Sequence, residues 1–254
     1  MIFRRLRRRR RWERGITDDE RQLIDASLWQ WKYLPAADQD RLIRRARLFI
    51  SEKHWEGCNG LQVTPAMQWA VAAAAALIVP PTSEFYFDAT ETVLLYPTAY
   101  LAQVNPSPGS LELGGQYARS GQTIYRGPVI LNWQDVEAAA TSDNGGDHLA
   151  IHELAHQIDF VNGPHADGLP PLPPSVDDQA WREAMGNELE QARRMVERGW
   201  RVDLDDYALS EPGEFFAVAS ECYFQTPREL AEFQPGVFDR LDDFYRFDLR
   251  ELLP

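Results

Sequence analysis

Apolar residues recur at helical spacing through the first third of the chain. Thr17 precedes an acidic run, which is typical of a helix start, and the pattern after it predicts a helix over residues 18–31. Residues 36–53 place leucine, isoleucine and phenylalanine on one side and arginine on the other. Residues 66–79 are rich enough in alanine and valine to predict a helix that is buried on all sides. We therefore expect residues 15–80 to form a helical N-terminal layer.

The pattern changes at two adjacent prolines, residues 80 and 81. Short stretches of β-branched and aromatic residues follow, and they predict strands at 84–87, 92–96, 123–125 and 129–133. Helical spacing then returns and predicts a helix that ends near residue 162, another over 177–199, a third that starts at Ser210 or Glu211, and closing helices after it. This order of elements predicts an α+β fold, with residues 15–80 and 81–254 packed as one compact unit.

Charge is unevenly spread along the 254 residues. The formal net charge is −13, but residues 1–14 contain eight arginines and one glutamate, which leaves −20 on the remaining 240 residues. A body this acidic repels phosphate backbones, so we expect no direct nucleic-acid binding by the folded body. We interpret residues 1–14 as a flexible, solvated basic tail. The alternative is an electrostatic contact with an acidic partner, with nucleic acid or with a membrane surface.

The sequence also bears on the cellular compartment. No apolar stretch of about 18 residues is free of polar interruption, so no membrane span is predicted. The arginine-rich start lacks the apolar run of a secretory signal. The two cysteines have no paired spacing and suit a reducing compartment. Together these features predict a cytoplasmic protein.

A His-Glu-x-x-His motif lies at His152, Glu153 and His156. Residues four apart lie one turn apart on the same helix face, so the two imidazoles can converge on one metal ion. This spacing is typical of zinc, and the glutamate beside the first histidine can act as general base toward a water molecule that the metal activates. The alternative is a solvated helix with two unrelated histidines. We predict a site for one Zn²⁺ per chain.

A catalytic zinc site needs a third protein ligand and keeps its fourth position for water. Glu214 falls in or near the first turn of an otherwise apolar helix, where a carboxylate is costly unless a cation meets it. The alternative is a contact with the helix dipole, a role that suits Glu211 better. Cys58 lies far upstream and Cys222 lies in an apolar run, so neither is a good ligand. The predicted ligands are therefore the two histidines and Glu214.

Other polar residues near the motif are weaker candidates for binding the metal. If His148 also bound the metal, three histidines on one helix would have to span about 12 Å along its axis, which is too far for one ion. Glu221 lies seven residues after Glu214 on nearly the same face, and it could contact a ligand histidine from behind. Asp159 could do the same or cap the helix end. We expect Asp147 to be the N-cap of the motif helix.

The wider sequence resembles the Mlc titration factor A family of zinc metallopeptidases, whose catalytic domain is similar to that of anthrax lethal factor. The motif with a distant glutamate looks like the gluzincin arrangement. Tyr207 stands seven residues before Glu214, as a tyrosine does before the glutamate ligand in both groups. The segments that also resemble the family are 48–53, the turn to 60–61, the alanine-rich helix, 127–133 and 168–173. The resemblance covers nearly the whole chain beyond the first dozen residues.

The resemblance implies a zincin-like fold, with a small mixed sheet, an active-site helix and a glutamate helix, and it makes residues 81–254 the catalytic part. It implies that Tyr207 donates a hydrogen bond to the oxyanion of the tetrahedral intermediate. The alternative for this residue is a buried aromatic side chain with a satisfied hydroxyl. It also implies that residues 127–133 lie near an edge strand that pairs with substrate, and an interior strand is the alternative.

The expected function is zinc-dependent hydrolysis of peptide bonds, with Glu153 as general base. The resemblance implies aminopeptidase-like activity on small substrates and binding to the transcriptional repressor Mlc. The rival hypothesis is a non-catalytic repressor-binding or titration protein whose zinc site is structural or latent. Glu153 argues against it, because a structural site needs no base and usually closes its fourth position. A zinc hydrolase with a non-peptide substrate is a third hypothesis.

Overall fold

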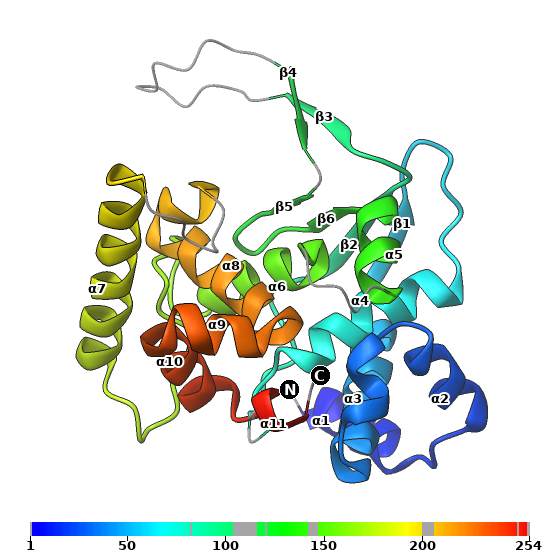
Figure 1. The fold of residues 1–254 in the computed structure, drawn as a ribbon. Coiled ribbons are helices and arrows are strands. Elements are labelled where there is room, and N and C mark those ends of the chain that lie inside the picture. Colours follow the sequence, from blue (N-terminus) through cyan, green and yellow to red (C-terminus); the bar gives the residue numbers. More distant parts are fainter. Residues whose placement is uncertain are drawn as a thin grey trace.

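Helices from both halves of the chain flank a small mixed sheet (Figure 1). The structure is a computed structural model, and it describes residues 2–81, 83–103, 116–119, 121–141, 147–199, 206–247 and 249–252. The predicted α+β class is confirmed, and the arrangement is consistent with a zincin-like metallopeptidase. Among the described residues, none of the helices combines the length and the apolar character that crossing a bilayer would require.

The predicted N-terminal helices are present as α2 (Asp18–Asp25), α3 (Ala36–Glu52) and α4 (Pro65–Leu77). Thr17 caps α2 in a capping box with Glu20. The helix predicted through residue 31 ends early and resumes as the 3-10 helix η1 (Trp29–Tyr33), whose tryptophan and glutamine side chains bond to the end of a distant helix. The alanine-rich α4 is buried from Trp69 to Leu77 and contacts α2, α3 and two later helices.

Residues 2–13 form a helix, α1 (Ile2–Glu13), where the sequence analysis expects a flexible tail. Arg4 and Arg8 form ion pairs with Glu52 at the end of α3 and with Asp88. Arg47 donates hydrogen bonds to the backbone carbonyl of Arg11 in α1 and to those of Arg14 and Gly15, which follow the helix. The composition of the segment alone does not reveal these partners, because they lie more than 30 residues away in the sequence.

The main sheet has the order β1-β2-β6-β5. The strands β1 (His54–Gly57), β2 (Thr92–Tyr96) and β6 (Val129–Asn132) are parallel, and β5 (Gly121–Thr123) is antiparallel to β6. The register places β2 and β6 with their buried valine and leucine side chains opposite one another. The strand predicted at 129–133 is therefore interior, and β5 is the edge strand beside it. A separate hairpin pairs β3 (Tyr100–Gln103) with β4 (Gln116–Arg119).

Other segments, besides the unpredicted β3 and β4 strands, also differ from the sequence-based expectations. Residues 84–87 form no strand, because Phe87 has a positive φ of 54°. Its ring packs on Phe49 and that of Phe85 packs on Phe87, so the aromatic residues do not alternate across a sheet. The β1 strand was not predicted, since four residues carry too short a pattern. The helix α5 (Trp133–Thr141) directly follows β6 and was also not predicted.

The remaining elements are helical and carry the site. They are α6 (Leu149–Asp159), α7 (Asp178–Glu197), the 3-10 helix η2 (Asp206–Leu209), α8 (Pro212–Gln225), α9 (Pro227–Phe233), α10 (Pro235–Tyr245) and α11 (Leu249–Leu252). One cluster of buried apolar residues runs from α2 through the sheet to α11. The division between residues 15–80 and 81–254 stays a prediction.

Candidate metal centre

The motif helix α6 is buried along almost its whole length. Its N-cap is His148, whose Nδ1 accepts a hydrogen bond from the Ile151 backbone N–H at 3.3 Å, so the expected cap Asp147 is wrong. Burial lowers the pKa of His148 to about 4, which keeps its ring neutral and able to accept. His148 therefore has a capping role and lies outside the group of metal-binding candidates.

The third candidate ligand comes from α8, which packs against α6. Pro212 occupies the first turn of α8, where its missing N–H costs nothing, and Glu211 is the N-cap residue. Glu214 then lies in the first turn, as the sequence predicts. The rest of α8 is mostly buried and apolar, so its packing holds this carboxylate in place.

The three predicted ligands converge. His152 Nε2 lies 3.2 Å from His156 Nε2 and 3.2 Å from Glu214 Oε2, and His156 Nε2 lies 3.3 Å from the same oxygen. Bonds of 2.0–2.1 Å to a tetrahedral zinc ion imply roughly 3.3 Å between ligand atoms. Two imidazole nitrogens and one carboxylate oxygen at this spacing fit a divalent metal and leave a coordination position for water.

Electrostatics within the group favour a cation. Burial opposes a charge on His152, but hydrogen bonds to Glu214 and Glu221 outweigh it and raise the pKa of the imidazole to about 10. Burial likewise opposes a charge on Glu214, but its hydrogen bonds to the two histidines hold the pKa of this carboxyl well below its usual range. The carboxylates thus stabilise positive charge at the position that a metal would take.

Glu221 orients the first histidine from behind, one of the roles that its spacing suggested. Its Oε1 lies 2.7 Å from His152 Nδ1, and its Oε2 accepts a hydrogen bond of 2.5 Å from the His148 backbone N–H. A proton on Nδ1 that is donated to this carboxylate leaves the lone pair of the imidazole on Nε2, the atom that faces the metal position. Two turns separate Glu214 from Glu221 on α8, so one helix supplies both a candidate ligand and the carboxylate that contacts His152.

Glu153 lies between α6 and the edge strand β5, and only 6% of its surface is exposed. A Cβ atom placed on Gly121 of β5 would lie 2.5 Å from Glu153 Oε1, closer than real contacts allow. The absence of a side chain at residue 121 therefore lets the strand pass over the predicted base. The sequence pattern does not reveal this role of Gly121, because it predicts the strand at 123–125 and the strand is formed by residues 121–123.

Tyr207 and Asp159 are two further residues for which the sequence suggests a role. Tyr207 falls in η2, immediately before α8, but its side chain lies outside the described part of the chain. Asp159 accepts a hydrogen bond from the Gly168 backbone N–H at 2.8 Å, so it holds the loop after α6. Among the described residues, Nδ1 of His156 is buried without a hydrogen-bond partner.

Comparison of the sequence with known proteins finds a matching family profile and similar named proteins. A family profile described as "Glucose-regulated metallo-peptidase M90" matches residues 3–246. "Mlc titration factor A" of Yersinia pestis (strain Pestoides F) is 35% identical over 216 residues, which is 83% of this chain and 78% of that protein. The protein of the same name from Yersinia pseudotuberculosis serotype O:3 (strain YPIII) shows the same identity and coverage. The chain belongs to the M90 metallo-peptidase family.

Membership of the M90 family implies a metallopeptidase-type enzyme and a divalent metal. Among the described residues, the histidines of α6 and Glu214 of α8 form the group of side chains that could bind such an ion.

Proposed function

We propose that this chain is a zinc-dependent peptidase, in which His152, His156 and Glu214 hold one zinc ion. The convergence of the three ligand atoms beside a buried glutamate carries the proposal. Zinc on these ligands would supply a Lewis acid that polarises the substrate carbonyl and lowers the pKa of water. Peptide cleavage by activated water needs a base within reach, and Glu153 is the neighbouring carboxylate.

The protein's own groups would share the remaining work. Glu153 would take the proton of the attacking water and pass it to the leaving amine. Its position under Gly121 restricts the carboxylate to one side of the motif helix. Tyr207 would donate a hydrogen bond to the developing oxyanion. The antiparallel edge strand β5 would pair with extended substrate backbone, since strand addition provides main-chain hydrogen bonds.

The family resemblance supports two finer proposals. The first is aminopeptidase-like activity on small substrates. The second is binding to a Mlc-type transcriptional repressor, because relatives with 35% identity carry the name Mlc titration factor A. The cytoplasm is the proposed compartment.

The alternative is a repressor-binding protein with a latent or structural metal site. The observation that favours this alternative is the name of the relatives, Mlc titration factor A. Two observations weigh against this alternative. The His-His-Glu group supplies three ligands, whereas structural zinc sites usually have four. A buried glutamate beside the first histidine is also not needed to hold a metal.

The deciding experiment compares the unmodified protein with Glu153→Gln and with Glu137→Gln, an exposed control on α5. Zinc content is measured by mass spectrometry, and turnover is measured on amino-acid anilides and quenched peptides. We expect near-stoichiometric zinc in all three proteins. We expect turnover to fall about 10²–10⁴-fold in Glu153→Gln alone.

Full zinc content without cleavage of any substrate would favour the binding protein. Repeating the assay with a purified Mlc-type repressor tests whether the enzyme needs its partner. A purified protein that neither contains nor takes up zinc would refute the proposed centre.

A further inference from the structure

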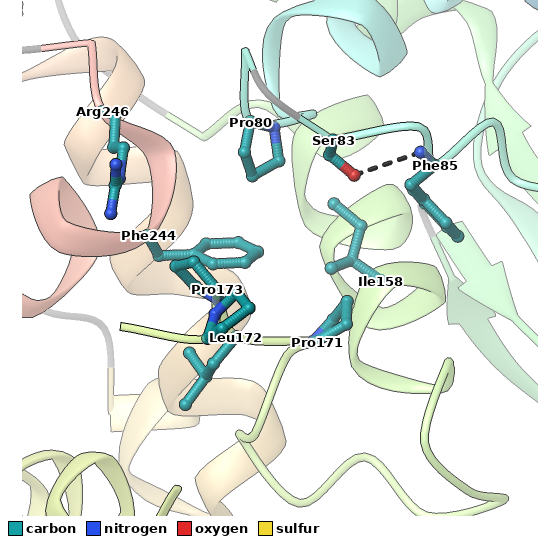
Figure 2. Close-up of a pocket in the computed structure, with 10 residues that line it drawn as sticks. Pro80, Ser83, Phe85, Ile158, Pro171, Leu172, Pro173, Phe244 and Arg246 are labelled. Carbon is teal, nitrogen blue, oxygen red and sulfur yellow. Dashed lines mark hydrogen bonds between the residues drawn. The ribbon is translucent and has the colours of Figure 1, made fainter. Parts of the chain in front are cut away.

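A pocket lies behind the motif helix, away from the metal-binding candidates. The loop after α4, the proline-rich loop after α6 and the end of α10 form its walls, and Figure 2 shows Phe244 of α10 and Ile158 of α6 facing each other between Pro80 and Pro171. Ile158 contributes from α6 and lies two residues beyond His156, which places it on the opposite helix face. None of the three candidate ligands lines the pocket.

The pocket has the size and character of a site for one apolar side chain. Its volume is about 200 Å³, and a cavity of roughly 150 Å³ holds a benzene ring in another protein. Phe85, Leu172 and Phe244 give it apolar walls. Four of its ten lining residues are prolines, whose fixed φ makes the walls stiff, so binding needs little ordering of the protein.

The polar groups at the pocket are hydrogen-bond donors. Arg246 is exposed at the rim, where its Nη2 donates to Ser175 Oγ at 3.1 Å and its Nε contacts the Asp243 carbonyl at 3.4 Å. Among the described residues its Nη1 has no partner. Ser83 Oγ accepts from the Phe85 backbone N–H at 3.1 Å, which leaves its O–H to donate. Among the described residues that line the pocket none is acidic, although the chain carries a net charge of −13.

We propose that this pocket binds the carboxy-terminal residue of a peptide that ends in a compact apolar side chain. The side chain enters the pocket, and the terminal carboxylate pairs with the Arg246 guanidinium, whose planar donors suit a carboxylate. A free amino acid fits less well, because its ammonium group would find no acidic side chain among the lining residues. A long fatty acid exceeds the volume. The site uses no metal and is independent of the proposed peptidase function.

Fluorescence anisotropy of the purified full-length protein tests the site, with an N-terminally labelled Gly-Ser-Gly-Leu peptide as probe. We expect saturable binding that weakens at least tenfold when the peptide ends in an amide. Arg246→Gln should weaken binding of the free acid at least tenfold without changing the thermal unfolding temperature. Arg240→Gln, on α10 but outside the pocket, is the matched control. Leu172→Trp, which adds volume to the pocket wall, should weaken both peptides.

Three results would overturn the proposal. One is equal binding of acid and amide. Another is binding that a chelator abolishes and that Arg246→Gln leaves unchanged, since the carboxylate would then be at the metal centre. The third is tighter binding of octanoate than of the peptide with the same dependence on Arg246, which would identify a free amphiphile as the occupant.

Discussion

Gly121 is the residue whose lack of a side chain matters most to the candidate centre. Gly121→Ala would push its Cβ against the Glu153 carboxylate and displace the proposed base. Misplacement by about 1 Å can cost on the order of 10²-fold in rate, so we expect a loss of kcat of about 10- to 100-fold with full zinc content. Steady-state kinetics and metal analysis check this. Gly186→Ala in α7 meets no neighbouring atom and is the control; equal kcat in both variants would contradict the prediction.

Glu221 provides a second prediction at the scale of single residues. Glu221→Gln preserves the shape of the side chain but removes the charge that supports His152. Loss of such a partner typically weakens metal binding 10- to 100-fold. Competition with a chromophoric chelator measures the zinc affinity. The exposed Glu229→Gln should leave this affinity unchanged, and an unchanged affinity in Glu221→Gln would exclude the supporting role.

At the scale of elements, one buried ion pair joins α2 to α3. Arg47 Nε and Nη2 donate to the two carboxylate oxygens of Glu20 at 2.7 and 2.6 Å. Burial by itself raises the pKa of Glu20, but these bonds and the Thr17 backbone N–H outweigh it and lower the pKa to about 2. A folded-state pKa below the ordinary value of 4.5 stabilises the fold above about pH 4.5, and this stability is lost as the pH falls toward 2.

We predict that Glu20→Gln destabilises the fold, because it leaves Arg47 buried without its counter-charge. A difference of this size in pKa corresponds to about 3 kcal/mol, in line with other broken buried pairs. We expect Glu20→Gln to lose a free energy of unfolding of this order at pH 7, and the loss to shrink as the pH falls from 4.5 to 2. Urea unfolding as a function of pH measures it, and Asp19→Asn, at the exposed neighbouring position in the first turn of α2, is the control. A loss that is independent of pH would show that the charge is not the cause.

At the scale of the whole molecule, α4 is the helix around which the two halves pack. It contacts α2 and α3 on one side and α5 and α6 on the other, and alanines let these helices approach closely. Ala73→Leu adds volume to a fully buried position and should destabilise the fold by about 1–3 kcal/mol. Ala37→Leu, which is exposed on α3, should have a small effect. Chemical denaturation distinguishes the two, and equal stability would indicate unfilled space around α4.

Prediction from sequence succeeded where the physical cause is local. The helical spacing of His152 and His156 places both rings on one face without any other part of the fold. Glu214 was found because a carboxylate in an apolar first turn is costly without a cation. Prediction failed for α1, because arginines within the segment do not reveal that Glu52 and Asp88 receive them. It also failed for residues 84–87, where aromatic alternation reflects packing on α3.

The sequence by itself predicted the candidate ligand group and the proposed base, and it determined the burial of α4 and the α+β order, since each follows from spacing or polarity within about one element. The tertiary structure alone decided that Glu221 supports His152, that Gly121 leaves room for Glu153, and that β5 forms the edge of the sheet. It also brought Arg246 to an apolar pocket behind α6. Apart from the pairing of β5 with β6, these features join residues between about 30 and 170 positions apart, and only packing in three dimensions brings such residues into contact.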